Sequence, residues 1–223
     1  MGNVNDFLAQ YGNLLAQGTL DTLCMLFVST AISYVFGLAL GIILYVTSPH
    51  GLKPMPITNA VLGWLVNMAR SIPFIILIVA LMPLTRQLVG TTIGVVGVTP
   101  PLVLATTPFV ARMVEQSLEE VDVSSIEAAV AFGASIPRIV VSALLPEALP
   151  SLVRGGSITL ITVLGYTAIA GAVGAGGLGD IAIRYGYYRY QDDIMVVTIV
   201  LLIVIVQIIQ SLGNIIAKRI DHR

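Results

Sequence analysis

The stretch from Thr19 to Val46 contains 28 residues, and its only charged residue, Asp21, lies near the start. A helix of this length exceeds the hydrocarbon core of a bilayer, which is about 30 Å thick, at a rise of about 1.5 Å per residue. The whole chain shows the same bias: 57% of its 223 residues are hydrophobic and 10% are charged, whereas an ordinary soluble domain carries about 25% charge. The stretch therefore predicts a membrane-spanning helix.

Four more apolar regions follow, so we expect an all-α polytopic membrane protein with a single transmembrane domain over residues 1–223. The second region is interrupted by Arg70, Ser71 and Pro73, which predicts an interfacial lead-in followed by a span. The third contains Pro100, Pro101 and Pro108, which predicts a kinked helix. The five expected spans are residues 19–46, 59–84, 91–113, 148–173 and 194–217.

Several classes of function are excluded by what the chain lacks. A net charge of -1 with 11 scattered Lys and Arg residues provides no basic patch for nucleic acid. A single cysteine, Cys24, allows no intrachain disulfide, and with only His50 and His222 we expect neither a metal site nor Ser-His chemistry. Residues 1–18 contain no Lys or Arg, so we expect a retained first span and not a cleaved signal peptide.

Two glycine motifs near the end of the fourth span are false signals. Residues 174–179 fit Gly-x-Gly-x-x-Gly, but they neither follow a predicted strand nor open a helix of a βαβ unit. Residues 177–180 fit the Gly-x-Gly-Asp pattern of intramembrane aspartyl proteases, but a second aspartate facing Asp180 within the membrane is missing. We expect a turn or a close helix contact here.

The positive-inside rule predicts the orientation of the five spans. With a cytoplasmic C-terminus and an external N-terminus, eight basic residues lie inside and three outside. The inside residues are Lys53, Arg70, Arg112, Arg138, Arg154, Lys218, Arg219 and Arg223; the outside ones are Arg86, Arg184 and Arg189. The loop 179–193, with its four tyrosines, is then external, and its tyrosines are expected to form an interfacial aromatic cluster or to help dock an external partner.

The segment 114–147, between the third and fourth spans, collects seven charged residues and is expected to be an aqueous cytoplasmic loop. Ser124 and Glu127 have capping-box spacing, which predicts a helix that starts there and ends at Gly133. Ser135 and Pro137 predict a second short helix that ends at Pro146. Small residues at Ala128, Ala129 and Gly133 leave a surface for close contact with another protein.

The spacing Glu127-Ala128-Ala129, then Gly133, then Leu145-Pro146 resembles the coupling loop of permease subunits of ATP-binding-cassette importers. The family usually has Ile at the position of Ala143. Three further stretches resemble the permeases of methionine importers within this family, and together they extend the resemblance from about Thr19 to the C-terminus. These stretches are residues 70–77 (RSIPFIIL), 108–115 (PFVARMVE) and 158–187, which contain GAVGAGGLG at 171–179.

The resemblance implies a non-catalytic permease in the bacterial inner membrane, without cofactors. It would pair with a second copy of itself, two cytoplasmic ATPase subunits and an external substrate-binding protein. The chain itself has no Gly-x-x-x-x-Gly-Lys-Ser/Thr loop, so ATP hydrolysis requires a partner. The ATPase-coupling residues are then Ser124, Glu127, Ala128, Ala129, Gly133, Leu145 and Pro146.

The hydroxyls of the fourth span are candidates for lining the translocation path: Ser157, Thr159, Thr162 and Thr167. The alternative is that they make helix-to-helix hydrogen bonds. The competing class of function is a self-contained channel or secondary transporter, in which the central loop would be passive. Against it, charge avoids the middle of the spans, whereas secondary transporters commonly place coupling charges there.

Overall fold

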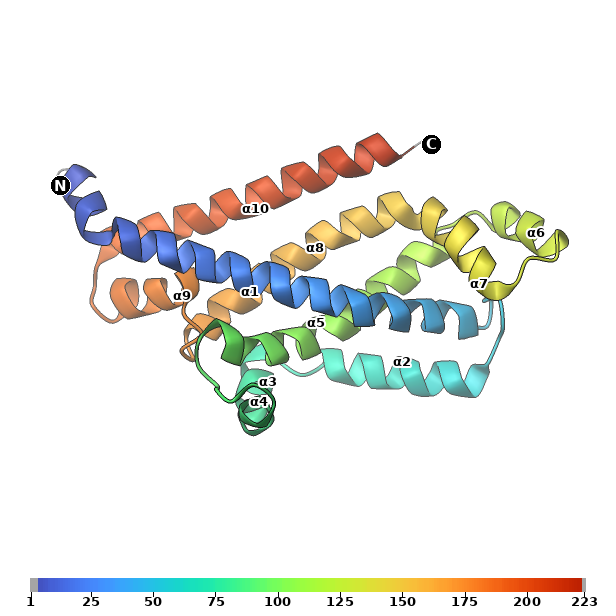
Figure 1. Ribbon diagram of the computed structural model, residues 1–223, viewed down its shortest axis with the longest axis horizontal. Helices are drawn as coiled ribbons and strands as arrows, with labels where there is room; N and C mark the ends of the chain where they lie inside the picture. The colour runs from blue at the N-terminus through green and yellow to red at the C-terminus, as the bar shows by residue number, and fades with distance from the viewer. Residues whose placement is uncertain (1–3, 222–223) are drawn as a thin grey trace. The chain divides into compact units, whose positions relative to one another are not determined.

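The computed structural model describes residues 4–221, apart from the side chains of Val4, Asn5, Ser125 and Ala128, and every regular element in this part is helical (Figure 1). His222 and Arg223, which figured in the sequence arguments, lie outside the described residues. In chain order the elements are α1 (Val4–Thr47), α2 (Pro56–Arg70), α3 (Phe74–Ala80), α4 (Met82–Val89), α5 (Gly94–Glu119), α6 (Val123–Ala131), α7 (Ile136–Ile139), the π-helix η1 (Val140–Leu144), α8 (Leu145–Gly171), α9 (Gly177–Ile181), the π-helix η2 (Ala182–Tyr187) and α10 (Asp192–Ile220).

Among the described residues, four continuous helices are long and apolar enough to cross a membrane, and a fifth span results if α2 and α3 form one broken span. The four are Asp6–Thr47, Gly94–Glu119, Ile136–Gly171 and Asp192–Ile220. Together with the broken pair they overlap the five regions expected from the sequence, and the first and third of these four helices begin at Asp6 and Ile136, 13 and 12 residues before the expected starts at 19 and 148. The fold is thus the all-α, multi-pass membrane architecture that the apolar pattern predicts.

The second region departs from the expected lead-in and span. Residues 59–84 form no single helix: α2 ends at Arg70, α3 begins at Phe74, and the two are bent by 95°. Ser71 closes α2 by donating its N–H to the carbonyls of Asn67 and Met68. Pro73 has no N–H to continue the ladder and becomes the N-cap of α3.

The described chain divides into two compact units, and α1, α5, α8 and α10 each run from one unit into the other. Unit 1 comprises Met1–Ala31, Pro73–Leu104 and Leu160–Ile209. In it, the glycine-rich segment makes the close approaches expected of a turn: Gly174, Gly176 and Gly177 have positive φ, and the N–H of Leu178 donates to Thr22 Oγ1 at 2.8 Å. The predicted turn or close helix contact is confirmed, and the element that precedes it is the helix α8.

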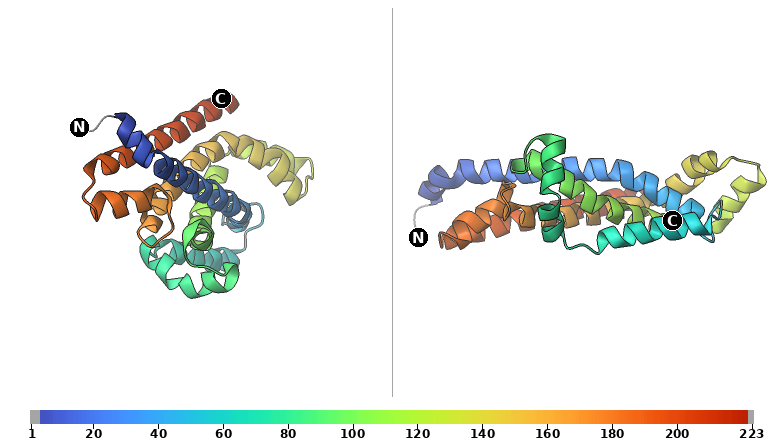
Figure 2. Two further views of the ribbon diagram at one scale, coloured as in Figure 1. Left: turned by 60° about the vertical axis from the view of Figure 1, so that its left-hand side comes forward. Right: turned by 90° about the horizontal axis from the view of Figure 1, so that it is seen from below.

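Unit 2 comprises Ile32–Ile72, Ala105–Thr159 and Gln210–Arg223. Its largest cluster of buried apolar side chains joins the ends of α1 and α5 to α6, α7, η1 and the start of α8; the members are Tyr45, Val110, Val114, Leu118, Val121, Ile126, Ile139, Val140, Leu144 and Ala148. In Figure 2, α6 and α7 adjoin each other at one end of this unit. The cluster gives the two short helices a defined position.

The central loop is shorter than the expected 114–147, because helices enter it from both sides. α5 continues to Glu119, and the charges at Glu115 and Glu119 do not end it. On the other side the helix is continuous from Ile136 to Gly171. Charge in this segment therefore indicates contact with water or polar groups, and it does not mark the end of a helix.

Candidate functional site

α6 begins at Val123, and its N-cap is Asp122, one residue before it. The backbone N–H of Ser124 donates to Asp122 Oδ1 at 2.9 Å, the contact that an N-cap side chain makes with the second residue of a helix. The expected capping box from Ser124 to Glu127 is therefore wrong, because both residues lie inside the helix. Aspartate is as strong an N-cap as serine, and it is favoured further by the positive end of the helix dipole.

α6 ends at Gly133, as the sequence predicts. Gly133 has φ +70°, its N–H donates to the carbonyl of Val130 at 2.9 Å, and the N–H of Ala134 donates to the carbonyl of Ala129 at 3.1 Å. This pair of bonds is a Schellman motif, in which the residue with left-handed backbone is commonly glycine. A Cβ at Gly133 would meet nothing within 4 Å, so the backbone conformation alone requires glycine here.

The two faces of α6 have different surroundings. Ile126 is buried in the unit 2 cluster, and Ala129 packs against that cluster. Val123, Glu127 and Val130, spaced as i, i+4 and i+7 on one helix face, are exposed. Because no capping contact holds Glu127, its carboxylate lies on this outward face. Of the predicted small residues, Ala129 faces inward and Gly133 is exposed; the Ala128 side chain lies outside the described part.

Phe132, directly after α6, has 91% of its surface exposed, the highest exposure of any large hydrophobic residue in the described part of the chain. With Val123, Glu127 and Val130 it forms what we call the α6 outer surface. Sequence reasoning missed Phe132 because it appeared to be only the last residue before a glycine terminator. The signal that could have identified Phe132 is the glycine that follows it. A helix-terminating glycine turns the chain away from the helix, so the residue before it lies at the end of the helix and not along its packed face.

The predicted second helix does not end at Pro146. Ser135 is its N-cap, as expected, but α7 passes through η1 into α8 without a break. In η1 the N–H of Leu145 donates to the carbonyl of Val140, five residues earlier. This wider turn changes the path of the backbone just before Pro146, whose ring would clash with the carbonyl four residues back in a regular α-helix. Leu145 packs against the buried cluster, whereas Pro146 is exposed.

The candidate hydroxyls of α8 have two kinds of environment. Thr159 and Thr167 are fully covered within the chain, and each donates to a carbonyl of its own helix, that of Gly155 at 2.9 Å and that of Leu164 at 2.8 Å. Ser157 and Thr162 are half-buried, and Ser157 donates to the carbonyl of Val153 at 3.3 Å. These two hydrogen bonds lie within α8 and do not join it to another helix.

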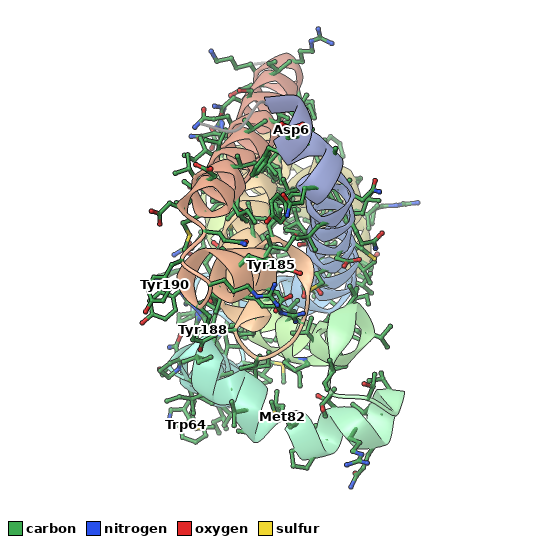
Figure 3. All side chains as sticks on the ribbon, turned by 90° about the vertical axis from the view of Figure 1, so that its left-hand side faces the viewer. Asp6, Trp64, Met82, Tyr185, Tyr188 and Tyr190 are labelled. Atoms are coloured by element: carbon green, nitrogen blue, oxygen red, sulfur yellow. The ribbon has the colours of Figure 1, made fainter. Side chains whose placement is uncertain are left out.

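The tyrosine-rich segment 185–190 lies in unit 1; residues 185–187 belong to η2, where a loop was expected, and residues 188–190 lie outside the helices. Tyr187, Tyr188 and Tyr190 are exposed, and Figure 3 shows Tyr188 and Tyr190 directed away from the ribbon. Arg189 lies over the ring of Tyr185, with its guanidinium carbon 4.5 Å from the ring centroid. Tyr190 has φ +56°, an uncommon backbone conformation for a bulky residue. The tyrosines thus form an exposed aromatic surface.

These features define a class of protein: a multi-pass helical membrane protein with a short, capped helix that connects two spans and carries an outward apolar and acidic surface. A family model described as "Binding-protein-dependent transport system inner membrane component" matches residues 37–222. The chain belongs to this family, and it is a transmembrane transport component.

Relatives match over almost the whole chain. The "Probable D-methionine transport system permease protein MetI" of Vibrio cholerae is 46% identical over 220 residues, which cover 99% of this chain and 98% of the relative. The "Methionine import system permease protein MetP" of Bacillus subtilis is 44% identical over 181 residues, 81% of this chain and 82% of that protein.

A solved structure confirms the fold at the level of the backbone. An inward-facing conformation of the MetNI methionine ABC transporter contains a chain that matches with a TM-score of 0.94 and 45% identity, covering 96% of this chain and 99% of the other.

Proposed function

We propose that this chain is the transmembrane permease subunit of an ATP-driven amino-acid importer, and that methionine is the amino acid it carries. The observation that supports this most strongly is the full-length match, at TM-score 0.94 and 45% identity, to a chain of a methionine ABC transporter. Two relatives named for methionine transport, from distant bacteria, agree with it. Two copies of the chain form the translocation path, because one copy carries one α6 and an importer with two ATPases needs two such contacts.

The α6 outer surface is the proposed contact with the cytoplasmic ATPase. Phe132 is an aromatic anchor suited to a partner's groove, and aromatic residues dominate the binding energy of many interfaces. Glu127 provides a charge with which a partner's Lys or Arg can pair. Because Ile126 anchors α6 in the unit 2 cluster, a push on α6 is transmitted to the ends of α5 and α8. Closure of two ATPases would then rock the spans and alternate access.

The orientation in the membrane and the candidates for the translocation path follow from the contact between α6 and the ATPase. The N-terminus is outside and the C-terminus is cytoplasmic in the inner membrane, so that α6 faces the ATPase. The exposed tyrosines 187, 188 and 190 then lie on the external side, where they meet the lipid interface or the substrate-binding protein. Ser157 and Thr162 remain the better candidates for lining the path, since Thr159 and Thr167 are covered by the chain itself.

Reconstitution tests the function. The chain is co-expressed with its candidate ATPase and binding protein, and ATP-dependent methionine uptake into proteoliposomes is measured with and without the ATPase. Uptake should require the ATPase, the binding protein and ATP together. Uptake that persists without the ATPase would indicate the competing class, a self-contained channel or secondary transporter, and would overturn the proposal.

A matched pair of variants tests the α6 outer surface. Phe132→Ala should weaken copurification of the ATPase and lower the affinity about tenfold or more, as for an interface hot spot. Val141→Ala, at another exposed apolar residue on η1, should change the affinity less than twofold. Gly133→Asp should also impair coupling, since it replaces the left-handed glycine next to Phe132. Equal effects of Phe132→Ala and Val141→Ala would place the contact elsewhere.

A further inference from the structure

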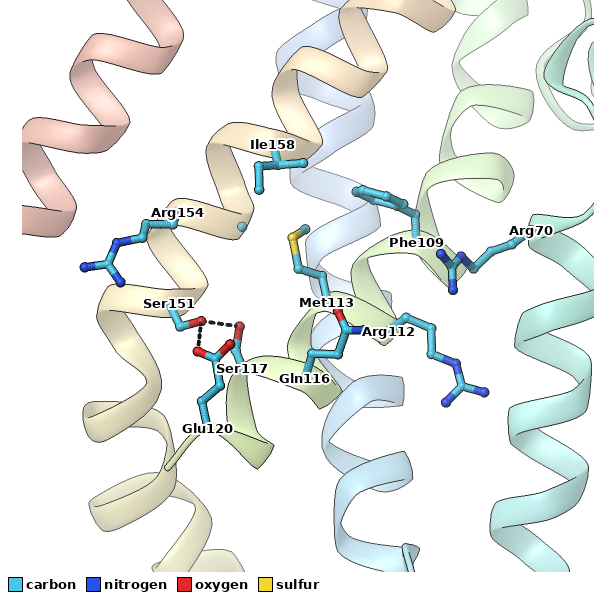
Figure 4. A pocket seen from close by; sticks show the side chains of 11 residues that line it. Arg70, Phe109, Arg112, Met113, Gln116, Ser117, Glu120, Ser151, Arg154 and Ile158 are labelled. Carbon is cyan, nitrogen blue, oxygen red and sulfur yellow. Dashed lines mark hydrogen bonds between the residues drawn. The ribbon is translucent and has the colours of Figure 1, made fainter. Parts of the chain in front are cut away.

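A pocket of about 290 Å³ lies within unit 2, between α2, α5 and α8 (Figure 4). One wall is apolar and consists of Phe109, Met113 and Ile158, and the remainder is polar. The volume is sufficient for several water molecules and therefore for a small zwitterion. A pocket with an apolar wall and a few polar groups is the usual form of a small-molecule site.

Two of the three arginines that line this pocket are neutralised by neighbours. Arg112 donates to Glu115 at 2.6 Å, and Arg154 donates to Asp221 at 2.6 Å. The lining carboxylate, Glu120, accepts a hydrogen bond from Ser151 Oγ at 2.8 Å. The charges of Arg112 and Arg154 are therefore balanced without a ligand.

Arg70 is the exception. It is the last residue of α2, at the break of the second span, and its guanidinium carbon lies 6.0 Å from the centre of the Phe109 ring. In the described part of the chain it has no acidic side chain within ion-pair distance. The carbonyls at the C-terminus of α2 offset a part of the charge. Arg70 is exposed, and because it has no carboxylate partner in the described part of the chain, its guanidinium is available to an anionic ligand.

We propose that this pocket is a transient site for the transported amino acid, in which Arg70 binds the α-carboxylate and the Phe109, Met113 and Ile158 wall receives the apolar side chain. The guanidinium presents a planar fork that matches a carboxylate. Phe109 and Met113 suit an unbranched thioether in particular, because sulfur makes favourable contacts with aromatic rings and methionine adapts to irregular partners. This proposal rests on the importer function proposed above.

Glu120 does not hold the ammonium group of the same molecule. It lies eleven residues beyond Phe109, and at about 1.5 Å per residue this is about 16 Å along α5, with Arg70 and Glu120 at opposite ends of the view in Figure 4. The site therefore recognises the carboxylate and the side chain and leaves the ammonium group in water. Such partial recognition suits a site on a path, which must release what it binds.

The test uses the complete complex of permease, ATPase and binding protein in proteoliposomes. Arg70→Gln removes the charge, Arg70→Lys retains it without the fork, and Arg86→Gln is the matched control, an exposed arginine of α4. Complex yield and ATPase activity are measured beside methionine uptake. We expect Arg70→Gln to assemble and hydrolyse ATP like the wild type while its uptake falls about tenfold to a hundredfold, the usual effect of losing one charged hydrogen-bond partner. Arg70→Lys should keep a measurable part of the uptake, and Arg86→Gln should stay within twofold of the wild type.

Three outcomes would overturn this site. Uptake by Arg70→Gln equal to that by Arg86→Gln would show that the charge is not used. Loss of the assembled complex would indicate that Arg70 pairs with a carboxylate of the second copy. A defect that disappears in vesicles made only of zwitterionic phosphatidylcholine would make the headgroup of an anionic lipid the occupant. The importer function is tested separately, by ATP-dependent uptake with the wild-type chain.

Discussion

Arg112 joins α5 to α2: it donates to Glu115 at 2.6 Å, three residues on in α5, and to the carbonyl of Gly63 in α2 at 3.0 Å. The Glu115 side chain is 9% exposed and that of Arg112 is 23% exposed, so this ion pair is largely removed from solvent. Because the pair is buried, the stability of each charged side chain depends on the presence of the other. Each charge is tolerated because the other is present, and the loss of one leaves the other uncompensated.

Glu115→Gln should therefore destabilise the chain strongly, by about 3 kcal/mol or more. Arg112→Met combined with Glu115→Met, which removes both charges, should recover most of this loss because no buried charge remains. Thermal unfolding of the purified chain in detergent, followed by loss of monodisperse protein, compares the variants. A double variant as unstable as Glu115→Gln would contradict the buried-pair explanation.

Replacement of Asp122 should affect α6 more than replacement of Ser124. Asp122→Ala removes the N-cap and should cost the helix about 1 kcal/mol, whereas Ser124→Ala removes an exposed hydroxyl from the first turn and should cost less than about 0.5 kcal/mol. Hydrogen exchange at the amides of residues 123–131 measures the difference directly. The opposite ranking would restore the capping box between Ser124 and Glu127.

Gly133 should tolerate asparagine better than alanine. Space is open around it, so the penalty comes only from the left-handed backbone, about 1–2 kcal/mol for an ordinary residue and less for asparagine. Gly133→Ala should thus loosen the end of α6 and lower the yield of the complex with the ATPase, and Gly133→Asn should lie between Gly133→Ala and wild type. If both variants behave like the wild type, the Schellman motif does not hold the end of α6 in solution.

Gly213 and Ser157 provide a test of packing between α10 and α8 in unit 2. A Cβ at Gly213 would overlap Ser157 Oγ, so Gly213→Ala should destabilise the chain by about 1–3 kcal/mol, the usual cost of overpacking. Adding Ser157→Gly makes room for the new methyl group and should restore most of the stability, less the small cost of glycine in a helix. Melting temperatures of the two single variants and the double variant give the coupling energy, and additive effects would contradict the contact.

The apolar spans and the glycine at the end of α6 were predictable from the sequence because each depends on a local property. Long uncharged runs need lipid wherever they lie, and a glycine after an Ala-rich stretch ends a helix through its own backbone. The cap of α6 was not predictable, since Asp122 and Ser124 are both good N-caps and a two-residue shift in where the helix starts decides between them. The continuation through Pro146 was equally hidden, because it depends on the π-turn of η1 just before the proline.

By itself, the sequence determined that this protein lies in a membrane, the approximate position of its apolar spans, and the segment 114–147 in which its charged residues collect. Hydrophobicity and glycine act within one stretch of chain, so no knowledge of neighbours was required. Only the tertiary structure decided which face of α6 is exposed, that Arg112 and Arg154 are neutralised while Arg70 is not, and that Thr159 and Thr167 are covered. Those properties depend on which residues meet across helices far apart in the chain, and a linear pattern does not contain this information.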